Sequence, residues 1–149
     1  MRPKVPKFVT SKALNIIAAH FYRSFQKLLN QELKRNGYKI TAEHLTVLIY
    51  VWEKNGRSQW ELAQELFKDK TTIAHLMSGL ESQRFIIRKK NRADGREKFV
   101  FITKRGTVVM FEIIEILQKI VKHTLRGITR RELEICRTVL RKAHNNLIT

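Results

Sequence analysis

The amino-acid sequence predicts a mostly helical fold with one small β-hairpin. Apolar residues recur every three or four positions along most of the chain, which is the spacing of amphipathic helices. Both prolines, Pro3 and Pro6, lie in the first six residues, so the rest of the chain is free to be helical. The pattern changes only over residues 85–102, where two short runs rich in β-branched and aromatic residues flank a turn. A length of 149 residues fits one domain.

The first half of the chain is expected to form four helices. The first begins near Leu14 and ends near Asn36-Gly37, a typical stop signal. The second begins near Thr41 and ends at Asn55-Gly56. Its apolar stripe, expected to be buried, comprises Leu45, Leu48, Ile49 and Trp52.

A short third helix and a fourth helix follow directly. Ser58 and Glu61 have the spacing of a capping box, which opens the third helix. Asp69 is a good N-cap for the fourth helix. The apolar stripe of the fourth helix comprises Ile73, Leu76, Met77 and Leu80.

The second half begins with the hairpin and ends with two long helices. Strands over 85–90 and 98–102 enclose the turn 91–96. Thr103 is expected to cap a fifth helix, which ends at Arg126-Gly127, and Thr129 with Glu132 forms a second capping box. The last helix carries a heptad seam of Leu133, Cys136, Leu140, Ala143 and Leu147.

The charge of the chain points to an anionic partner. Lys and Arg number 30 against 13 Asp and Glu, a formal net charge of +17, and the densest basic block is residues 84–105. A hydrophobic content of 43% argues against disorder, and no apolar run is long enough to span a membrane. The N-terminus lacks a cleavage signal, and Cys136 is the only cysteine, so we expect a cytoplasmic protein without a disulfide.

Residues 58–67 and 69–83 form two short helices joined by a tight turn, which is the pattern of a helix-turn-helix. The second helix of this motif normally enters the major groove of DNA. Its candidate DNA-binding residues are Lys68, Lys70, Thr71, Thr72, His75 and Ser78. The basic hairpin that follows can contact the DNA backbone or the minor groove as a wing. Its candidate residues are Arg88, Lys89, Lys90, Arg92, Asp94, Arg96 and Lys98.

From Ile40 to Gly106 the sequence resembles the MarR family of bacterial transcriptional regulators. The resemblance rests on several motifs whose order and spacing agree, among them Gly56-Arg-Ser-Gln-Trp-Glu-Leu-Ala63, Lys68-Asp-Lys-Thr-Thr-Ile73, Leu80-Glu81, Asp94-Gly-Arg96 and Ile102-Thr-Lys-Arg-Gly106. It implies one domain over 1–149: a winged helix-turn-helix over 40–106, flanked by long N- and C-terminal dimerisation helices over 8–36 and 107–147.

The resemblance also implies residue roles and partners. Arg96 would reach the minor groove with Asp94 as its positioner, and a small aromatic or anionic effector would relieve DNA binding. The family usually has glycine where this chain has Arg84. If the backbone there is left-handed, Arg84 is strained, and an extra positive charge beside the DNA would be the gain.

Dimerisation is expected on physical grounds as well, because one small domain cannot cover the long apolar helices at both ends. A two-fold dimer would bind a pseudo-palindromic operator in double-stranded DNA. The alternatives are a nonspecific nucleic-acid-binding protein and a dimeric scaffold that uses the winged helix for protein contacts. The sequence shows no motif of an enzyme, no cofactor site and no metal-site spacing among its five histidines. Cys136, on the apolar seam, is expected to be buried and inert rather than a redox sensor.

Overall fold

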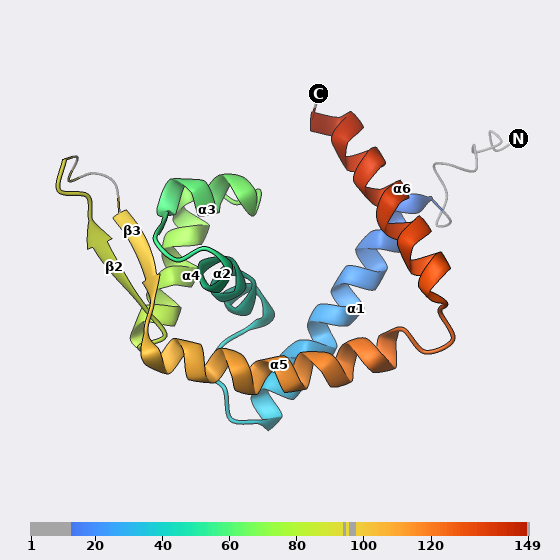
Figure 1. The fold of residues 1–149 in the computed structure, drawn as a ribbon, viewed down its shortest axis with the longest axis horizontal. Helices are drawn as coiled ribbons and strands as arrows, with labels where there is room; N and C mark the ends of the chain where they lie inside the picture. Colours follow the sequence, from blue (N-terminus) through green and yellow to red (C-terminus); the bar gives the residue numbers. More distant parts are fainter. Residues whose placement is uncertain (1–12, 94, 96–97, 149) are drawn as a thin grey trace, which may run out of the picture. The chain divides into compact units, whose positions relative to one another are not determined.

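The computed structural model describes residues 13–93, 95 and 98–148 (Figure 1). It divides the chain into two compact units, Met1–Leu117 and Gln118–Thr149, with the boundary inside the fifth helix. The first unit holds helices α1 to α4, a small sheet and most of α5. The second holds the end of α5 and helix α6.

The predicted helices are confirmed, with bounds close to those expected. The helices are α1 (Leu14–Arg35), α2 (Ala42–Glu53), α3 (Gln59–Glu65), α4 (Lys70–Ser82), α5 (Lys104–Thr124) and α6 (Arg130–Ile148). Both capping boxes form as predicted, and the backbone N–H of Thr72 donates to Asp69, the N-cap of α4. The Thr103 hydroxyl accepts from the Gly106 N–H and caps α5.

The hairpin consists of β2 (Ile86–Lys90) and β3 (Lys98–Ile102), paired antiparallel with Ile86 opposite Ile102 and Lys90 opposite Lys98. The sequence did not predict a third strand, β1 (Arg57–Ser58), which pairs with the other side of β3. The sheet order is therefore β1-β3-β2. Because β1 leads directly into α3, this pairing ties the hairpin to the helix-turn-helix.

The core of the first unit lies between α2, α3, α4 and the sheet. The four residues of the predicted α4 stripe are all buried. The predicted α2 stripe was partly wrong, because Trp52 is 39% exposed whereas Val47 and Val51 are fully buried. Helix α2 packs against α4 on one face and against β3 on another. A prediction of one buried stripe therefore includes too few of the buried residues of α2.

Three helices end in the same hydrogen-bonded motif, in which the residue after the C-cap has a positive φ. At α1 this residue is Gly37 (φ 81°), whereas at α3 it is Phe67 (φ 51°) and at α4 it is Arg84 (φ 60°). In each case its N–H and the next one bond back to the last turn of the helix. The strain expected at Arg84 is thus confirmed, and Phe67 carries the same strain. A non-glycine residue in this region costs about 1 kcal/mol.

The second unit, by itself, leaves its apolar side chains exposed. Helix α6 contains no buried residue, and exposed apolar side chains on it include Ile135, Val139, Leu140, Leu147 and Ile148. Cys136 is also exposed, contrary to the expected burial, because α6 contains no buried residue. Among the described residues, no helix is long and apolar enough to cross a membrane.

Candidate nucleic-acid interface

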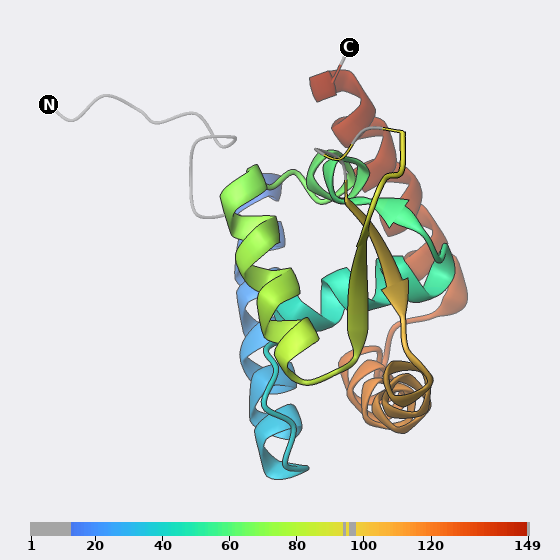
Figure 2. The same ribbon diagram turned by 90° about the vertical axis from the view of Figure 1, so that its left-hand side faces the viewer.

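The N-terminal end of α4 and the tip of the hairpin lie at the same end of the first unit (Figure 2). At this end of α4, Lys70 and Thr71 are exposed, and His75 is exposed one turn further along. The Thr72 hydroxyl instead donates to the Asp69 carboxylate, at 2.7 Å. The helix end therefore offers short polar and basic side chains, which suit a phosphate or a base edge.

Lys68 and Ser78 have partners within the chain. The Lys68 ammonium donates to Glu43 of α2 at 2.7 Å, and its side chain is largely covered. The Ser78 hydroxyl donates to the Ala74 carbonyl and accepts from Arg88. Both side chains therefore help to hold α4 against its neighbours.

A histidine on α2 packs directly against α4. A Cβ added at Gly79 would lie 2.3 Å from Nε2 of His44, so this contact requires glycine. The His44 ring also bonds at Nδ1 to Thr41, the N-cap of α2. Burial lowers the pKa of His44, as does, to a smaller extent, the neighbouring His75. His44 thus helps to set the spacing between α2 and α4 at Gly79.

Arg88, at the start of the wing, forms an ion pair with α4. Its guanidinium donates to the Glu81 carboxylate at 2.5 and 3.0 Å, and the Arg88 backbone N–H donates to the same carboxylate. These hydrogen bonds hold the pKa of Glu81 below its usual value. Arg88 therefore connects β2 to α4, which is a positioning contact.

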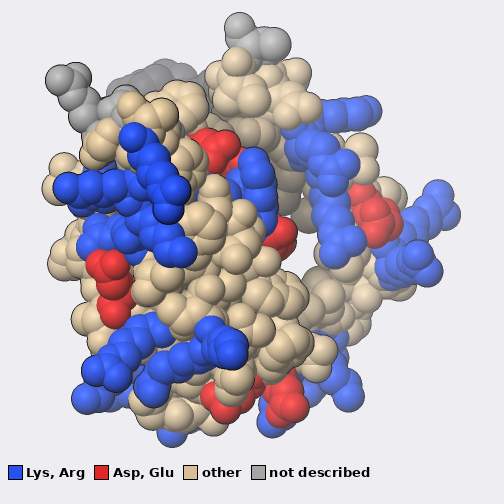
Figure 3. Space-filling model, turned by 60° about the vertical axis from the view of Figure 1, so that its left-hand side comes forward, with Lys and Arg blue, Asp and Glu red and all other residues tan. Residues whose placement is uncertain are grey.

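The outer part of the hairpin carries exposed cations. Lys90 and Lys98 lie directly opposite each other, and like charges in this register repel. Lys89 lies over the Phe101 ring with 5.1 Å between its ammonium and the ring centroid, and Arg92 is exposed near the tip. Asp94 and Arg96 lie outside the described residues. Figure 3 shows Lys and Arg side chains in several groups on one face, with acidic side chains beside some of these groups. An anion laid along the hairpin would relieve this repulsion.

Arg84 follows Gln83, the C-cap of α4, and so lies at the opposite end of this helix from Lys70. A helix of this length separates its ends by roughly 20 Å. The gain expected for Arg84, a positive charge beside the DNA, therefore has no support from its position.

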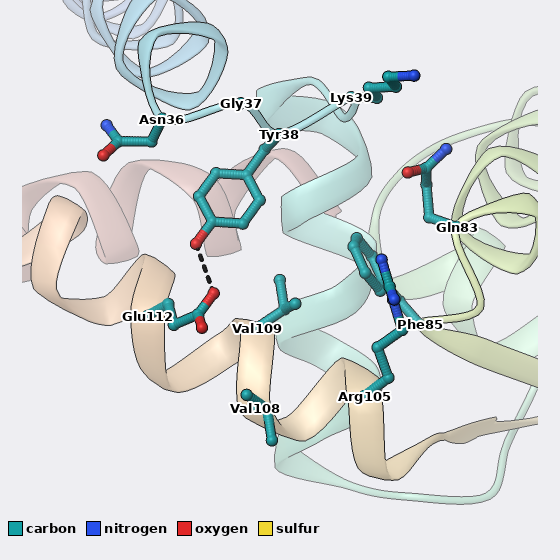
Figure 4. A pocket seen from close by; sticks show the side chains of 10 residues that line it. All are labelled: Asn36, Gly37, Tyr38, Lys39, Gln83, Phe85, Arg105, Val108, Val109 and Glu112. Atoms are coloured by element: carbon teal, nitrogen blue, oxygen red, sulfur yellow. Dashed lines mark hydrogen bonds between the residues drawn. The ribbon is translucent and has the colours of Figure 1, made fainter.

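A pocket of about 480 Å³ lies at that far end, between the α1–α2 loop, the end of α4 and the first turns of α5 (Figure 4). The Tyr38 hydroxyl donates to Glu112 at 2.7 Å, and burial together with this carboxylate raises the pKa of Tyr38 to about 12. The Arg105 guanidinium lies over the Phe85 ring, 5.7 Å from its centroid. Val108 and Val109 supply apolar wall. The pocket thus combines a cation with apolar surface.

Sequence reasoning missed two features of this region. Glu81 was not expected to hold Arg88, because a pair formed across seven residues and two elements leaves no local pattern. Phe67 was not singled out either, although a signal existed: the turn between the two helices contains no glycine or asparagine to adopt a positive φ.

The comparison with known proteins identifies the family. The family model described as "Transcriptional regulator SarA/Rot" matches residues 29–113, more than half of the chain. The chain belongs to this family. SarA/Rot proteins are MarR-like winged-helix regulators, so the predicted MarR resemblance and the predicted fold are both confirmed.

Individual relatives agree with this assignment. The HTH-type transcriptional regulator TtmR of Methylorubrum extorquens is 29% identical over 124 residues, which are 83% of this chain and 58% of TtmR. A crystal structure of MarR superposes with a TM-score of 0.80 at 23% identity, covering 99% of this chain and 95% of that one. The Staphylococcus aureus MepR–DNA complex gives a TM-score of 0.80 at 20% identity, covering 90% of this chain and 98% of MepR. TtmR is thus named as a transcriptional regulator, and the two solved structures share the fold of this chain.

Proposed function

We propose that this SarA/Rot protein is a homodimeric, sequence-specific DNA-binding regulator of transcription. In this proposal the N-terminal part of α4 enters the major groove, and the hairpin contacts the minor groove or the backbone beside it. The observation that carries it is that the N-terminal end of α4 lies at the same end of the first unit as the hairpin tip (Figure 2). Lys70, Thr71 and His75, in the first turns of α4, are exposed. The solved MepR–DNA complex, which has the same fold, supports it.

We assign most of the candidate residues to one of two roles, according to whether a partner within the chain holds them. The residues assigned to contact DNA are exposed: Lys70, Thr71 and His75 on α4, and Lys90 and Lys98 on the wing. Lys68, Thr72, Ser78 and Arg88 are engaged within the chain, and we assign them to positioning α4 and β2. Asp94 and Arg96 keep the roles that the resemblance implies, a positioner and a minor-groove arginine.

The exposed apolar side chains support the dimer. They occur on all three helices outside the winged helix-turn-helix: Leu14, Ile17, Phe21 and Tyr22 on α1, Val108, Phe111 and Val121 on α5, and those of α6. Monomeric proteins rarely expose so much apolar surface. A second copy of the chain would cover it, including Cys136, and would fix the spacing of two recognition helices.

The pocket at the far end of α4 is the candidate effector site. Arg105 offers a cation to an anionic group, and Phe85, Val108 and Val109 offer surface to an apolar body, which fits a small aromatic carboxylate. The pocket is connected to the recognition helix, because the Thr103 hydroxyl donates to the Arg84 carbonyl at 2.7 Å. A ligand there would act on the end of α4 without touching the DNA.

A test of the DNA interface uses the Lys90–Lys98 pair. Lys90→Ala should weaken binding to duplex DNA and lower the slope of log affinity against log salt by about 0.9, because one phosphate contact is lost. It should leave the folded protein at least as stable, since the like-charge pair is removed. Affinity measured by fluorescence anisotropy at several salt concentrations, with thermal unfolding in parallel, decides this.

Lys34→Ala is the matched control, because Lys34 lies on the last turn of α1 at the end away from the hairpin tip. It should change neither the affinity nor the slope. If Lys90→Ala behaved like Lys34→Ala, the wing would not contact the DNA.

A further inference from the structure

Helix α1 carries a row of cations on one face. Arg23, Lys27 and Lys34 follow one another at spacings of four and seven residues, which place them on the same side of the helix. All three side chains are exposed. An open groove of about 440 Å³ lies along this face, lined by the three cations and three amides: Arg23, Gln26, Lys27, Asn30, Gln31 and Lys34.

The cations of this row are not balanced by acidic side chains. The one acidic residue of α1 is Glu32, and it pairs with Arg35 at 2.7 Å. Within the part of the chain that the structure describes, Arg23, Lys27 and Lys34 form no ion pair. Arg23 and Lys27 are four residues apart, and like charges at this spacing destabilise a helix. An anion bound along the row would relieve this repulsion.

The basic row faces away from the apolar side of α1. The exposed apolar residues Leu14, Ile17 and Phe21 share one side of the helix. Arg23 comes two positions after Phe21, which turns it by about 200° around the helix axis. A second copy of the chain that covers the apolar side in the proposed dimer therefore leaves the basic row open.

The direction of α1 argues against duplex DNA as the partner of this row. Lys34 lies in the last turn of α1, at the end of the first unit away from the hairpin tip (Figure 2). From Arg23 to Lys34 the row extends roughly 16 Å along the helix axis. It thus runs away from the end that is proposed to meet DNA, and a duplex bound at α4 and the hairpin would not cover it.

We propose that the row of Arg23, Lys27 and Lys34 binds an acidic helical segment of a partner protein. Carboxylates at spacings of four and seven residues lie on one face of such a helix, so they meet the three cations in turn. The exposed Gln31 amide adds a hydrogen-bond donor and an acceptor beside the row. This function goes beyond DNA binding, and the partner is held while DNA is bound.

The test uses a fluorescein-labelled, alanine-rich helical peptide with glutamates at these spacings. Its affinity for the full chain is measured by fluorescence anisotropy with saturating operator duplex, which occupies the cations of α4 and the hairpin. The triple variant Arg23→Gln/Lys27→Gln/Lys34→Gln keeps good helix formers. It should bind the peptide about tenfold more weakly, as expected for the loss of three exposed ion pairs. Its affinity for the duplex should stay within about twofold of wild type.

The matched control is the triple variant Lys104→Gln/Lys119→Gln/Lys122→Gln. It removes three exposed cations from α5 and gives the chain the same net charge as the α1 variant. It should bind the peptide like wild type. An equal loss in both variants would mean that the peptide responds to net charge alone, which would overturn the inference.

Two further results would overturn the inference while the proposed DNA binding stands. One is a fall in duplex affinity of the α1 variant alongside the peptide affinity, which would assign the row to DNA. The other is unchanged peptide binding by the α1 variant with weaker binding of a single-stranded RNA, which would assign the row to RNA. A wild-type chain that binds no duplex would contradict the proposed function alone, because the two triple variants can then be compared on the chain without DNA.

Discussion

Side chains around α4 differ in whether a partner within the chain already holds them. Glu81 accepts from the guanidinium and the backbone of Arg88, and Lys68 donates to Glu43, so these cations are committed to the fold. Lys70 and Lys90 are exposed on the same unit. A count of positive charges in the sequence treats all four cations alike, although only the exposed ones can give up water to a phosphate at little structural cost.

The Glu81–Arg88 ion pair predicts a pH dependence of stability. The pKa of Glu81 is lowered in the folded state, so its contribution is present above the ordinary value of 4.5 and is lost as the pH falls through the folded-state pKa. At pH 7, Glu81→Gln should lower Tm by about 2–4 °C, from a loss of about 1 kcal/mol at this partly exposed pair.

The difference in Tm between wild type and Glu81→Gln should shrink as the pH falls below 4.5. Thermal unfolding of both proteins from pH 7 to pH 3 checks this, and the other carboxylates cancel because both proteins share them. A difference that stays constant down to pH 3 would mean that the ion pair does not stabilise the fold.

The best-predicted helices and strands are those whose ends are determined by side chains close in sequence. The caps at Ser58, Asp69 and Thr129 follow from side chains a few residues away, and the helix bounds followed from them. Strand β1 was missed because its two residues are strand only through pairing with Val100 and Phe99, more than 40 positions later. Burial of Trp52 was wrongly predicted because periodicity shows which face of a helix is buried, but not how wide the surface packed against that face is.

The start of α5 is fixed to the end of α4 by a junction that the sequence did not reveal. A Cβ at Gly106 would lie 2.1 Å from the Phe85 carbonyl oxygen, so the two backbones touch there. The Thr103 N–H also donates to that carbonyl, at 3.0 Å. Because the candidate effector pocket is lined by Phe85 and Arg105 on either side of this junction, a ligand in it would displace both elements together.

This arrangement predicts an effect of small aromatic anions. Millimolar benzoate should weaken DNA binding by wild type several-fold, and Arg105→Ala should remove the effect because the carboxylate loses its cation. Lys104→Ala is the matched control, since Lys104 is exposed beside Arg105 but does not line the pocket. DNA affinity measured with and without benzoate decides it. Equal responses of the two variants would place the effector site elsewhere.

The proposed binding to paired half-sites of DNA requires two copies of the chain. The sequence predicted an apolar seam on the last helix, and in the single chain this helix has no buried residue. The sequence pattern indicates that the apolar seam of α6 must pack against another surface. The structure of a single chain does not show which surface that is. The dimer remains our proposal, and what supports it is the exposed apolar side chains of α1, α5 and α6.

Sequence-specific binding by a dimer is tested by selecting bound duplexes from a random pool at physiological salt and sequencing them. Wild type should enrich an inverted repeat whose half-sites are centred roughly 34–36 Å apart, one turn of DNA. Leu140→Asp, which puts a charge into the apolar seam of α6, should fail to enrich paired half-sites, whereas Lys142→Asp should enrich them. Salt-sensitive binding by wild type with no enriched sequence would contradict the account and indicate a nonspecific nucleic-acid-binding protein.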